Sequence, residues 1–379
     1  MSEQVCRFGI LGSATIARKN WQAIRHAPNC ALVAVASRQL ERARRFVAEC
    51  QAEVPIDPPP LALGSYEELL SRDDIDAVYL PLPTGTRVQW AVRAADAGKH
   101  VLSEKPVGAD AGDVQQILDA CRRNEVQFMD GVMFMHSRRL AQIRAVLDGS
   151  PQQPSGNTCA DTRDIGRIKR ITSQFSCSVP DEFFRENIRM NSRLEPLGCL
   201  GDLGWYNLRF TLWAMNEQLP QEVRARTLSQ QAGAGGPAPV PVEFSGELFY
   251  PDASASFYCS FLTEHQQWAV ISGTKGAIHV RDFVLPYYGS EVAFEVAKPV
   301  FHVRGCDFNM QEHTHRFATA EYSNGAATAQ ETNLFRNFAQ LALSGQPDHR
   351  WGEQAWKTQR LLDACLKSAG EGRALAMTD

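Results

Sequence analysis

Lys105 is the first residue whose type and position could do chemistry. It follows an apolar run at residues 100–103 and precedes Pro106. Such a run is typical of a buried strand, so Glu104 and Lys105 would stand at the edge of a sheet, where open parallel sheets bind their ligands. A lysine at that edge can donate a hydrogen bond or a proton to a ligand oxygen. The alternative is a solvated turn lysine, because a single short motif often arises by chance.

Asp202 and Tyr206 form a second pair that could act on a ligand. They lie four positions apart, so on a helix they would share one face and could address the same cleft. The alternative is that Trp205 and Tyr206 are core aromatics of an amphipathic helix. Asp202 and the two glycines beside it, Gly201 and Gly204, favour a functional role.

A glycine-containing turn follows the first apolar run of the chain. Gly12, Ala14 and Ala17 occupy the glycine positions of the dinucleotide-binding fingerprint G-x-G-x-x-G. Gly12 can make the tight turn and Ala17 permits close helix packing, but the methyl group of Ala14 keeps the backbone further from a pyrophosphate. The alternative is an ordinary tight turn of an α/β fold. The predicted cofactor-binding residues of this turn are Gly12, Ser13, Ala14, Thr15 and Ile16.

Ser37 and Arg38 follow the second apolar run. A dinucleotide-binding domain normally has an acidic residue there, about 20 residues beyond the glycines, to hold the ribose 2′-hydroxyl. A hydroxyl and a guanidinium suit a 2′-phosphate instead, which a carboxylate would repel. The pair therefore predicts NADP(H) as the preferred cofactor, with NAD(H) as the alternative. Arg42, Arg44 and Arg45 follow on the next predicted helix. The alternative is that this helix is a solvated face paired with Glu41 and Glu49, as we expect for Arg44 and Arg45.

The elements that position these residues alternate along the first third of the chain. Apolar runs predict strands at residues 5–11, 31–36, 76–80, 100–104 and 126–130. Apolar residues at three- and four-residue spacing predict helices at residues 16–26, 39–52, 86–97 and 110–124. This alternation is typical of a parallel sheet with helices on both faces.

Length and composition exclude several classes of protein. The 379 residues are 44% hydrophobic, which is more than one core usually supports, so we expect two domains. The chain has 39 basic and 43 acidic residues without a long block of like charge, so neither nucleic acid nor a membrane is an expected partner. Its ten cysteines are scattered singly, which favours reduced thiols over disulfides or a metal cluster. The N-terminus lacks the pattern of a signal peptide, so we expect a cytoplasmic protein.

Four segments together resemble the Gfo/Idh/MocA superfamily of oxidoreductases. They are residues 9–17, 80–84, 98–106 and 201–206, and their order and spacing extend over almost the full chain. The last segment contains the family pattern D-x-G-x-[HY], met here by Asp202, Gly204 and Tyr206. The tyrosine version, with Ser37 and Arg38 after the second strand, is most similar to the branch that holds glucose-fructose oxidoreductase, dimeric dihydrodiol dehydrogenase and NADP-dependent xylose dehydrogenase.

The resemblance implies the fold and the sites. It implies an α/β N-terminal Rossmann domain, residues 1–127, and an α+β C-terminal domain, residues 128–379, with a large open, mostly antiparallel sheet and a substrate cleft between the domains. Tyr206 would be the acid/base, Lys105 would hydrogen-bond the same substrate oxygen, and Asp202 would orient Lys105 or the substrate. Because a free tyrosine titrates near ~10, Lys105 would have to lower the pKa of Tyr206. Further cofactor contacts would come from Pro81, Leu82, Thr84, Glu104, Lys105 and Pro106.

Three other positions concern the substrate site or a metal. Arg189 would contact the substrate or the nicotinamide carboxamide, the alternative being a surface arginine. The family often has His where Arg87 stands and Asp where Arg209 stands, so substrate contacts could differ. The pattern Glu312-His313-Thr314-His315 would place two imidazoles on one face of a strand, but two such ligands are too few, and no metal site is expected.

The second part of the chain is rich in residues that favour strands. Strands are predicted near residues 168–178, 222–228, 242–250, 253–262, 268–273 and 277–280, arranged as a meander, with helices at 138–147, 327–343 and 353–369. Loops are predicted at 149–166 and 231–241. Because Phe244, Leu248, Tyr250, Phe257, Tyr258 and Phe261 suggest apolar residues on both faces of the sheet, we expect a homodimer or homotetramer joined through it.

These observations predict an NADP(H)-dependent oxidoreductase that transfers hydride between nicotinamide and a hydroxyl or carbonyl carbon of a sugar, cyclitol or vicinal diol. One alternative is a non-catalytic, dinucleotide-binding regulatory protein of the same fold. Another is an NAD-assisted glycosidase. Retention of Lys105, Asp202 and Tyr206 together favours the oxidoreductase.

Overall fold

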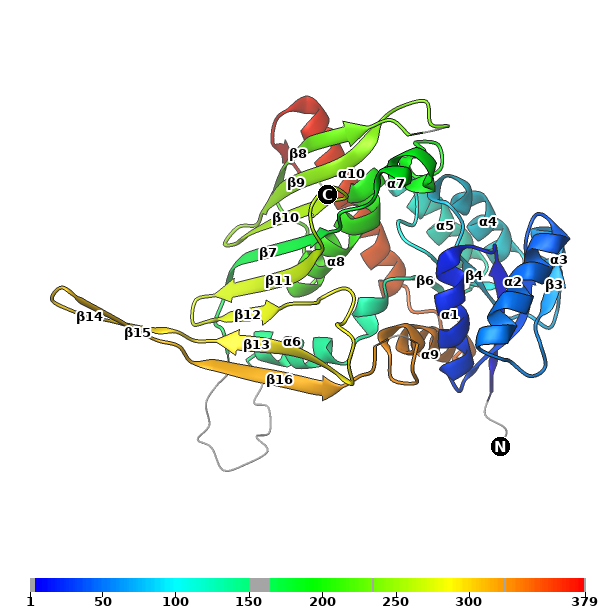
Figure 1. Ribbon diagram of the computed structural model, residues 1–379, viewed down its shortest axis with the longest axis horizontal. Coiled ribbons are helices and arrows are strands. Elements are labelled where there is room, and N and C mark those ends of the chain that lie inside the picture. Colours follow the sequence, from blue (N-terminus) through cyan, green and yellow to red (C-terminus); the bar gives the residue numbers. More distant parts are fainter. Residues whose placement is uncertain (1–3, 150–163, 234, 324, 378–379) are drawn as a thin grey trace.

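Six short strands pair into the parallel sheet of the N-terminal part of the chain (Figure 1). The computed structural model describes residues 4–149, 164–233, 235–323 and 325–377. The spatial order is β3-β2-β1-β4-β5-β6, and it reverses between β1 and β4, where sheets of this kind bind ligands. The strands are β1 (Cys6–Leu11), β2 (Cys30–Ala36), β3 (Leu61–Leu63), β4 (Ala77–Leu80), β5 (His100–Ser103) and β6 (Phe128–Asp130).

Helices cover both faces of this sheet. Ala77 and Tyr79 of β4 join a hydrophobic core with α1 and α2, whereas Val78 and Leu80 join the opposite core with α3, α4 and α5. Every residue of β4 is therefore buried, as expected for a central strand of a parallel sheet. The helices are α1 (Thr15–His26), α2 (Leu40–Glu53), α3 (Tyr66–Leu70), α4 (Thr84–Asp96) and α5 (Ala111–Arg123).

The predicted strands and helices of this part are confirmed, with ends displaced by one or two residues. Only β3 and α3 were missed, because elements of three and five residues are too short to show a period. β6 pairs with β5, and α9 (Gln330–Leu343) returns from the end of the chain to pack against α1 and β1. The division of the chain at residues 127 and 128 stays a prediction.

The second sheet has nine strands in the order β16-β13-β12-β11-β7-β10-β9-β8-β17, and all neighbours are antiparallel except β7 and β10. The predicted fold class is confirmed. The predicted simple meander is wrong, because β7, the first strand in sequence, lies in the middle of the sheet between β10 and β11. The strands are β7 (Ile168–Ser176), β8 (Glu222–Gln231), β9 (Val240–Phe249), β10 (Ser254–Ser260), β11 (Gln266–Gly273), β12 (Ala277–Val280), β13 (Glu291–Ala297), β16 (Thr314–Ala320) and β17 (Leu375–Ala376).

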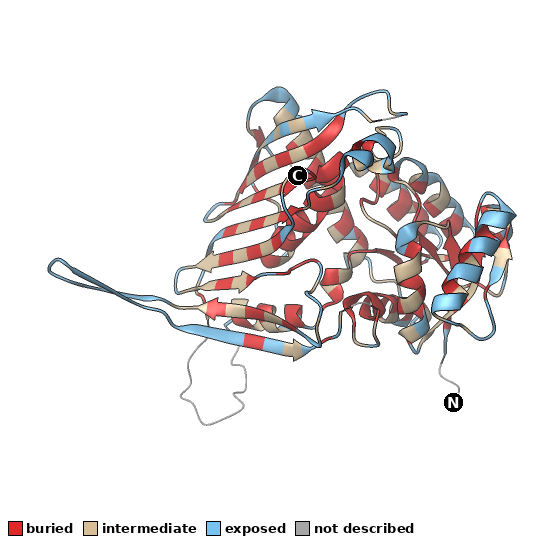
Figure 2. Cartoon of the chain, in the orientation of Figure 1, coloured by how far each residue is buried: buried red, intermediate tan, exposed pale blue. Residues whose placement is uncertain are grey.

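One face of this sheet packs against helices. The buried residues alternate along each strand, so that Phe244 and Leu248 of β9 and Phe257 of β10 lie on the helix-covered face, as Figure 2 shows by alternating colours. The premise that both faces are apolar is therefore wrong, because of the six residues cited for it only Tyr258 belongs to the other face. The helical segments are η1 (Met133–His136), α6 (Arg139–Leu147), α7 (Asp181–Glu186), η2 (Ile188–Met190), η3 (Leu200–Gly204), α8 (Trp205–Ala214) and α10 (Arg350–Glu371).

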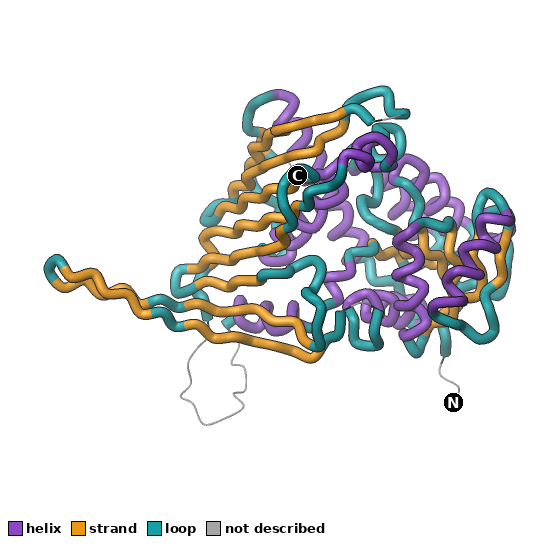
Figure 3. Tube along the Cα trace, in the orientation of Figure 1, coloured by secondary structure: helices purple, strands orange, loops and turns teal. Residues whose placement is uncertain are grey.

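Two loops were predicted in this part. The connection between β8 and β9 agrees with the loop predicted at residues 231–241, as far as the structure describes it. Most of the loop predicted at residues 149–166 lies outside the described residues. A further ribbon, β14 (Val300–Arg304) paired with β15 (Asp307–Gln311), was not predicted and projects beyond the ends of the other strands (Figure 3).

Candidate active site

Lys105 stands directly after β5, where the backbone leaves the sheet. Its Nζ donates hydrogen bonds to the carboxylate Oδ1 of Asp202 at 2.8 Å and to the main-chain oxygen of the same residue at 2.5 Å. The Lys105 side chain is only 9% exposed, so this ammonium group is held rather than solvated. The solvated turn lysine is thereby excluded in this structure.

Asp202 lies between two cations. Its other carboxylate oxygen, Oδ2, accepts a hydrogen bond of 2.6 Å from Nε of Arg189. Burial opposes ionisation of Asp202, but the attraction of Arg189 and Lys105 outweighs it and lowers the pKa of Asp202 below its ordinary value. The same attraction to Asp202 raises the pKa of Arg189. The structure thus brings Lys105, Asp202 and Arg189 into one ionised cluster.

Tyr206 meets Lys105 through its ring. Nζ of Lys105 lies 4.6 Å from the ring centroid, within the range of a cation–π contact. Asp202 belongs to η3, a π-helical segment, and Tyr206 to the α-helix α8 that continues it. The wider π turn changes the helical spacing predicted for the two residues, yet both address the same ammonium group, and π segments are frequent at functional sites.

The hydroxyl of Tyr206 donates a hydrogen bond to Sδ of Met133 at 3.6 Å. Burial, followed by the negative charges of Glu104 and Asp202, raises the pKa of Tyr206 well above its ordinary value. The expectation that Lys105 lowers this pKa is therefore wrong here, because Lys105 faces the ring while its charge is paired with Asp202. The tyrosine is protonated at neutral pH in this arrangement.

Behind Lys105 lies a buried hydrogen-bond chain that the sequence did not suggest. Nδ2 of Asn20 donates to the hydroxyl of Tyr79 at 2.6 Å, and this hydroxyl donates to Oε1 of Glu104, also at 2.6 Å. Asn20 comes from α1 and Tyr79 from β4, so the chain ties both to the Glu-Lys-Pro turn. In the sequence, the one sign of this hydrogen-bond chain was Asn20, a polar residue on an otherwise apolar face of a predicted helix. Glu104, half-buried, accepts this hydrogen bond, and its predicted contact with the cofactor stays a prediction.

Arg87 and Thr84 hold the neighbouring strand exit. The buried guanidinium of Arg87 donates to the main-chain oxygens of Leu82 and Pro106, and so joins the turns that follow β4 and β5. Glu195 accepts hydrogen bonds from the Thr84 amide at 3.1 Å and from its hydroxyl at 2.6 Å. Arg87 thus holds the two turns that are predicted to contact the cofactor. The family often has His at this position, but the Arg87 side chain is buried, so the difference does not alter an exposed group.

Arg209 is also buried away from the cleft. Its guanidinium forms a two-pronged ion pair with Asp130, with distances of 3.2 and 2.8 Å, and donates to Thr358 at 2.8 Å. Both charged side chains are 0% exposed. The pair joins β6 to α8, and the bond to Thr358 adds α10.

The predicted phosphate-binding turn connects β1 to α1. Gly12 has φ +117°, and a Cβ added there would lie 3.1 Å from Leu82, so the position suits glycine. Ala14 is the N-cap of α1 and provides no capping side-chain hydrogen bond, and although the Ala17 amide donates to the Ala14 main-chain oxygen at 3.0 Å, the amides of Thr15 and Ile16 at the start of the helix could bind an anion. Ser13, Thr15 and Ile16 are partly or fully exposed beside them. This arrangement fits a dinucleotide pyrophosphate.

The predicted 2′-phosphate site lies at the end of β2. Ser37 is buried and Arg38 is exposed, and the positive charges of Arg38 and Arg42 both act on Tyr66, whose hydroxyl lies near Gly12. Among the residues that the structure describes, neither arginine forms an ion pair, whereas Arg44 pairs with Glu41 at 2.7 Å as expected. Glu49 pairs with Arg18 rather than with an arginine of its own helix. Tyr66 was missed because α3, in which it lies, was missed.

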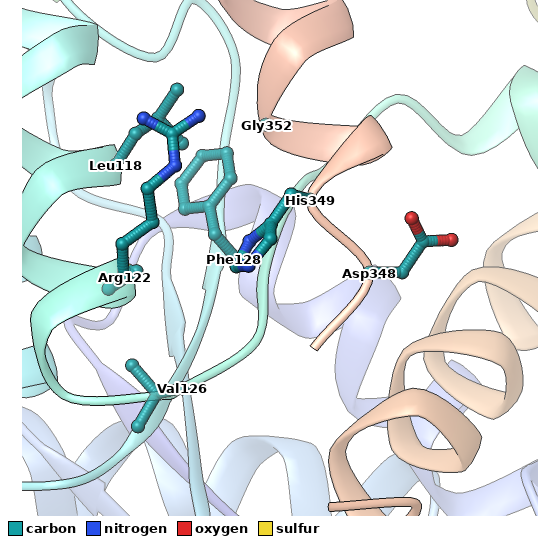
Figure 4. Close-up of a pocket in the computed structure, with 8 residues that line it drawn as sticks. Leu118, Arg122, Val126, Phe128, Asp348, His349 and Gly352 are labelled. Atoms are coloured by element: carbon teal, nitrogen blue, oxygen red, sulfur yellow. The ribbon is translucent and has the colours of Figure 1, made fainter. Parts of the chain in front are cut away.

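Two other features are not part of the cluster. Within the described ranges, no group of three His, Cys, Asp or Glu residues is placed to hold a metal. A hollow of about 10 Å³ between α5, β6 and the start of α10 is bordered by Phe128, Asp348 and His349 (Figure 4). This volume has room for about one water molecule, so the hollow cannot hold a cofactor.

Comparison with known proteins agrees with this geometry. The family described as "Oxidoreductase family, NAD-binding Rossmann fold" (GFO_IDH_MocA) matches residues 6–132, and the "GFO/IDH/MocA C-terminal domain" matches residues 158–279. The chain belongs to the Gfo/Idh/MocA family of oxidoreductases. The resemblance found in the sequence is therefore confirmed.

Relatives of this Gfo/Idh/MocA oxidoreductase cover nearly the whole chain. It is 26% identical to dTDP-3,4-didehydro-2,6-dideoxy-alpha-D-glucose 3-reductase of Actinomadura kijaniata over 96% of this chain and 95% of that protein. It is 28% identical to D-xylose 1-dehydrogenase (NADP(+)) 2 of Haloferax volcanii over 98% of this chain and 99% of that protein. The crystal structure of a 3-ketoreductase from Actinomadura kijaniata with NADP and TDP-benzene has a TM-score of 0.75 at 23% identity, and covers 96% of this chain and 98% of that one. That structural likeness supports the fold.

Family membership makes the protein an oxidoreductase, while the roles of its individual residues stay proposals.

No helix in the described portion has the length and apolar character needed to cross a membrane.

Proposed function

We propose that the protein is an NADP(H)-dependent oxidoreductase that acts on a hydroxyl or carbonyl carbon of a sugar, cyclitol or vicinal diol. The observation that carries the proposal is the contact of Lys105 with both Asp202 and Tyr206 at the carboxyl end of the parallel sheet. Open α/β sheets bind ligands at that end, so the cluster stands where a cofactor and a substrate would meet. Curated relatives named as sugar reductases and a xylose dehydrogenase support this substrate class.

The cofactor site supports the NADP form. First-turn N–H groups of α1 would hold the pyrophosphate beside Gly12, with Pro81, Leu82 and Pro106 forming the neighbouring turns. Arg38 and Arg42 would bind the 2′-phosphate, because neither is neutralised by an acidic partner among the described residues. The name of the Haloferax volcanii relative also states NADP(+). The nicotinamide, when bound, supplies or accepts the hydride.

The ammonium group of Lys105 would donate a hydrogen bond to the reacting oxygen of the substrate. Asp202 holds this group in place by its hydrogen bonds, and Arg189 shares the same carboxylate at the more exposed side of the cluster. Because Arg189 is 40% exposed, it can also contact the substrate. The positive charge near the oxygen favours the negative charge that develops there during either direction of the reaction.

Tyr206 would exchange the proton. Its raised pKa keeps the hydroxyl protonated at neutral pH, so the residue starts the reduction of a carbonyl in the productive form and gives its proton to the oxygen. In the oxidation direction the Tyr206 hydroxyl would first have to lose its proton to solvent, and the phenolate would then accept the proton of the substrate hydroxyl after the substrate displaces Met133.

A turnover screen tests the function. Aldoses, cyclitols and vicinal diols are offered with NADP⁺ and NAD⁺, and the matching ketones and lactones with the reduced cofactors, while the absorbance of the reduced form is followed. We expect turnover with NADP(H) in at least one of the three substrate classes. Tight cofactor binding without turnover of any class would favour the dinucleotide-binding regulatory protein, and release of a glycoside aglycone without net change of cofactor would favour the glycosidase.

A further inference from the structure

The connection between β12 and β13, residues 281–290, lies at the edge of the large sheet that borders the active-site cluster. β11 pairs antiparallel with both β7 and β12, so β7 and β12 end at the same edge. Phe175, the penultimate residue of β7, contacts the ring of Tyr206, with centroids 5.5 Å apart. Figure 1 shows the connection on the side of the sheet that faces the N-terminal part of the chain. The connection therefore begins at the edge where Tyr206 also lies.

The start of the connection packs around the aromatic neighbours of Tyr206. The buried ring of Phe283 lies 6.5 Å from the ring of Phe175 and 5.9 Å from the ring of Phe134. Both of these rings contact Tyr206, at 5.5 and 6.1 Å between centroids. One layer of side chains thus separates the connection from Tyr206.

Buried amide side chains hold the backbone of the connection. Oε1 of Gln267 accepts a hydrogen bond from the Leu285 amide at 2.7 Å, and Nε2 of Gln267 donates to the Leu285 main-chain oxygen at 2.6 Å. Nε2 of Gln330 donates to the main-chain oxygen of Val284 at 2.8 Å. Both glutamines are buried, so opening the connection would leave buried polar groups without these partners, which is costly. The connection is therefore held in one conformation.

A buried ion pair holds the next part of the connection. Arg139, which is 1% exposed, pairs with Oδ1 of Asp282 at 2.5 Å and also donates to the main-chain oxygen of Asp282. The other carboxylate oxygen, Oδ2, accepts a hydrogen bond from the Tyr287 amide at 2.9 Å. The carboxylate of Asp282 thus links a buried cation to the backbone of Tyr287.

This fixed backbone presents two tyrosines to solvent. Tyr287 is 60% exposed and Tyr288 is 92% exposed. Directly after them, the Gly289 amide donates to Oγ of Ser323 at 3.3 Å. Tyrosines on a preformed backbone are typical of recognition sites, because the side chain has few rotatable bonds and the backbone needs no ordering when a ligand binds.

The chemistry of the connection fits a sugar ring. The carbon-bound hydrogens of a pyranose form an apolar face that can be buried against an aromatic ring, and its hydroxyls can bind a tyrosine hydroxyl. Residues 283–290, all of which the structure describes, include no Lys or Arg, and Arg281 pairs with Glu295 at 3.3 Å. A nucleoside diphosphate would therefore find no unpaired cation on this connection.

We propose that Tyr287 and Tyr288 form a subsite for a second sugar ring, joined by a glycosidic bond to the sugar that reacts at Lys105 and Tyr206. The substrate is then a disaccharide or a longer glycoside rather than a free monosaccharide. This inference rests on the proposed function, because it extends the same site. Contacts remote from the reacting carbon supply binding energy that a monosaccharide cannot use.

Paired substrates test the subsite. Glucose is compared with maltose and cellobiose, and xylose with xylobiose, by kcat/KM with NADP⁺. We expect at least one disaccharide to exceed its monosaccharide by about tenfold, and Tyr287→Ser with Tyr288→Ser to remove this advantage without changing kcat/KM for the monosaccharide. Tyr287→Phe with Tyr288→Phe keeps both rings and should keep most of the advantage. Both tyrosines lie outside the hydrophobic cores, so Tm should be unchanged in both double variants.

Saturation-transfer NMR tests the same contact without turnover. With NADPH bound, the enzyme cannot oxidise maltose, cellobiose or xylobiose, so binding is observed alone. Irradiation of the aromatic protons of the enzyme should saturate both rings of the preferred disaccharide in wild type and in the double phenylalanine variant. In the double serine variant only one ring should be saturated.

The outcomes separate this inference from the proposed function. Equal kcat/KM for monosaccharides and disaccharides, with saturation of at most one ring in wild type, would overturn the subsite, while turnover of the monosaccharides would leave the proposed function intact. Saturation of both rings without turnover of any sugar would support the subsite and refute the proposed function. A lower molecular mass of the double serine variant in light scattering would assign the two tyrosines to a protein contact and would also overturn the subsite.

Discussion

The ammonium group of Lys105 is bound twice by one residue, Asp202, which follows it 97 positions later in the chain. The carboxylate and the main-chain oxygen of Asp202 together hold the ammonium group in place, so the Glu-Lys-Pro turn after β5 is tied to η3 in the second part of the chain. One ion pair therefore both joins the two parts and holds the proposed catalytic group.

Removal of either of the two groups proposed to contact the reacting oxygen should abolish most activity. We expect Lys105→Met and Tyr206→Phe each to lower kcat by on the order of 10² or more, with NADP affinity nearly unchanged, because both would act mainly in the transition state. Tyr250→Phe is the matched control, since the Tyr250 hydroxyl is buried without a hydrogen-bond partner among the described residues. Steady-state kinetics and a fluorescence titration measure the two quantities. Full activity in both site variants would refute the mechanism.

Asp202→Asn should act through Lys105 and Arg189. We expect a loss of kcat/KM of about tenfold, smaller than for Lys105→Met, because an amide can still accept the Lys105 hydrogen bond but cannot balance two buried cations. The variant should also lose about 1–3 kcal/mol of unfolding free energy at neutral pH. A loss as large as that of Lys105→Met would make Asp202 more than an orienting group.

The stability effect of Asp202 should depend on pH. The folded-state pKa of Asp202 is lowered, so its contribution is complete above the unfolded value near ~3.9 and is lost as the pH falls through the folded value. Urea unfolding of wild type and Asp202→Asn should therefore give a constant difference at neutral pH that shrinks in strong acid, wherever both remain folded. A difference that grows on acidification would contradict the ion-pair assignment.

Cofactor choice should depend on Arg38. We expect Arg38→Ala to weaken NADP binding by roughly tenfold to a hundredfold and to leave NAD binding almost unchanged, because a guanidinium makes charge-assisted hydrogen bonds to a 2′-phosphate. Arg44→Ala is the control, since Arg44 is paired with Glu41 on the surface of the same helix. Titrations with both dinucleotides decide the point. Equal losses for NAD and NADP would indicate that Arg38 stacks on the adenine instead.

The buried pair of Arg209 and Asp130 should matter for stability rather than for chemistry. Arg209→Met leaves Asp130 buried without its partner and should cost about 3–5 kcal/mol, whereas Arg209→Met combined with Asp130→Leu should recover much of this loss. Urea midpoints measure both variants. If the single variant were as stable as wild type but lost substrate affinity, Arg209 would belong to the substrate site after all.

Much of the N-terminal half of the fold could be predicted because its information is local. The apolar runs that became β1, β2, β4 and β5 and the three- and four-residue periods of α1 and α5 are properties of neighbouring residues. β3 and α3 were not predicted because they are too short to show a period, and Tyr66, the first residue of α3, was missed for the same reason. The order of the nine-stranded sheet escaped for a different reason, because the partner of β7 is chosen by packing between distant segments.

The sequence by itself determined which chemical groups are available: a lysine at a strand exit, an aspartate and a tyrosine near one helix start, and a serine-arginine pair in place of an acidic residue. Only the tertiary structure decided how they act on one another. In the folded protein the ring of Tyr206, rather than its hydroxyl, faces Lys105. Asp202 lies between the two cations Lys105 and Arg189. Arg87 and Arg209 are buried inside the protein. These outcomes depend on burial and on the distances between residues far apart in the chain. Burial and such distances set the pKa of a charged group, and the spacing of neighbouring residues in the sequence does not reveal them.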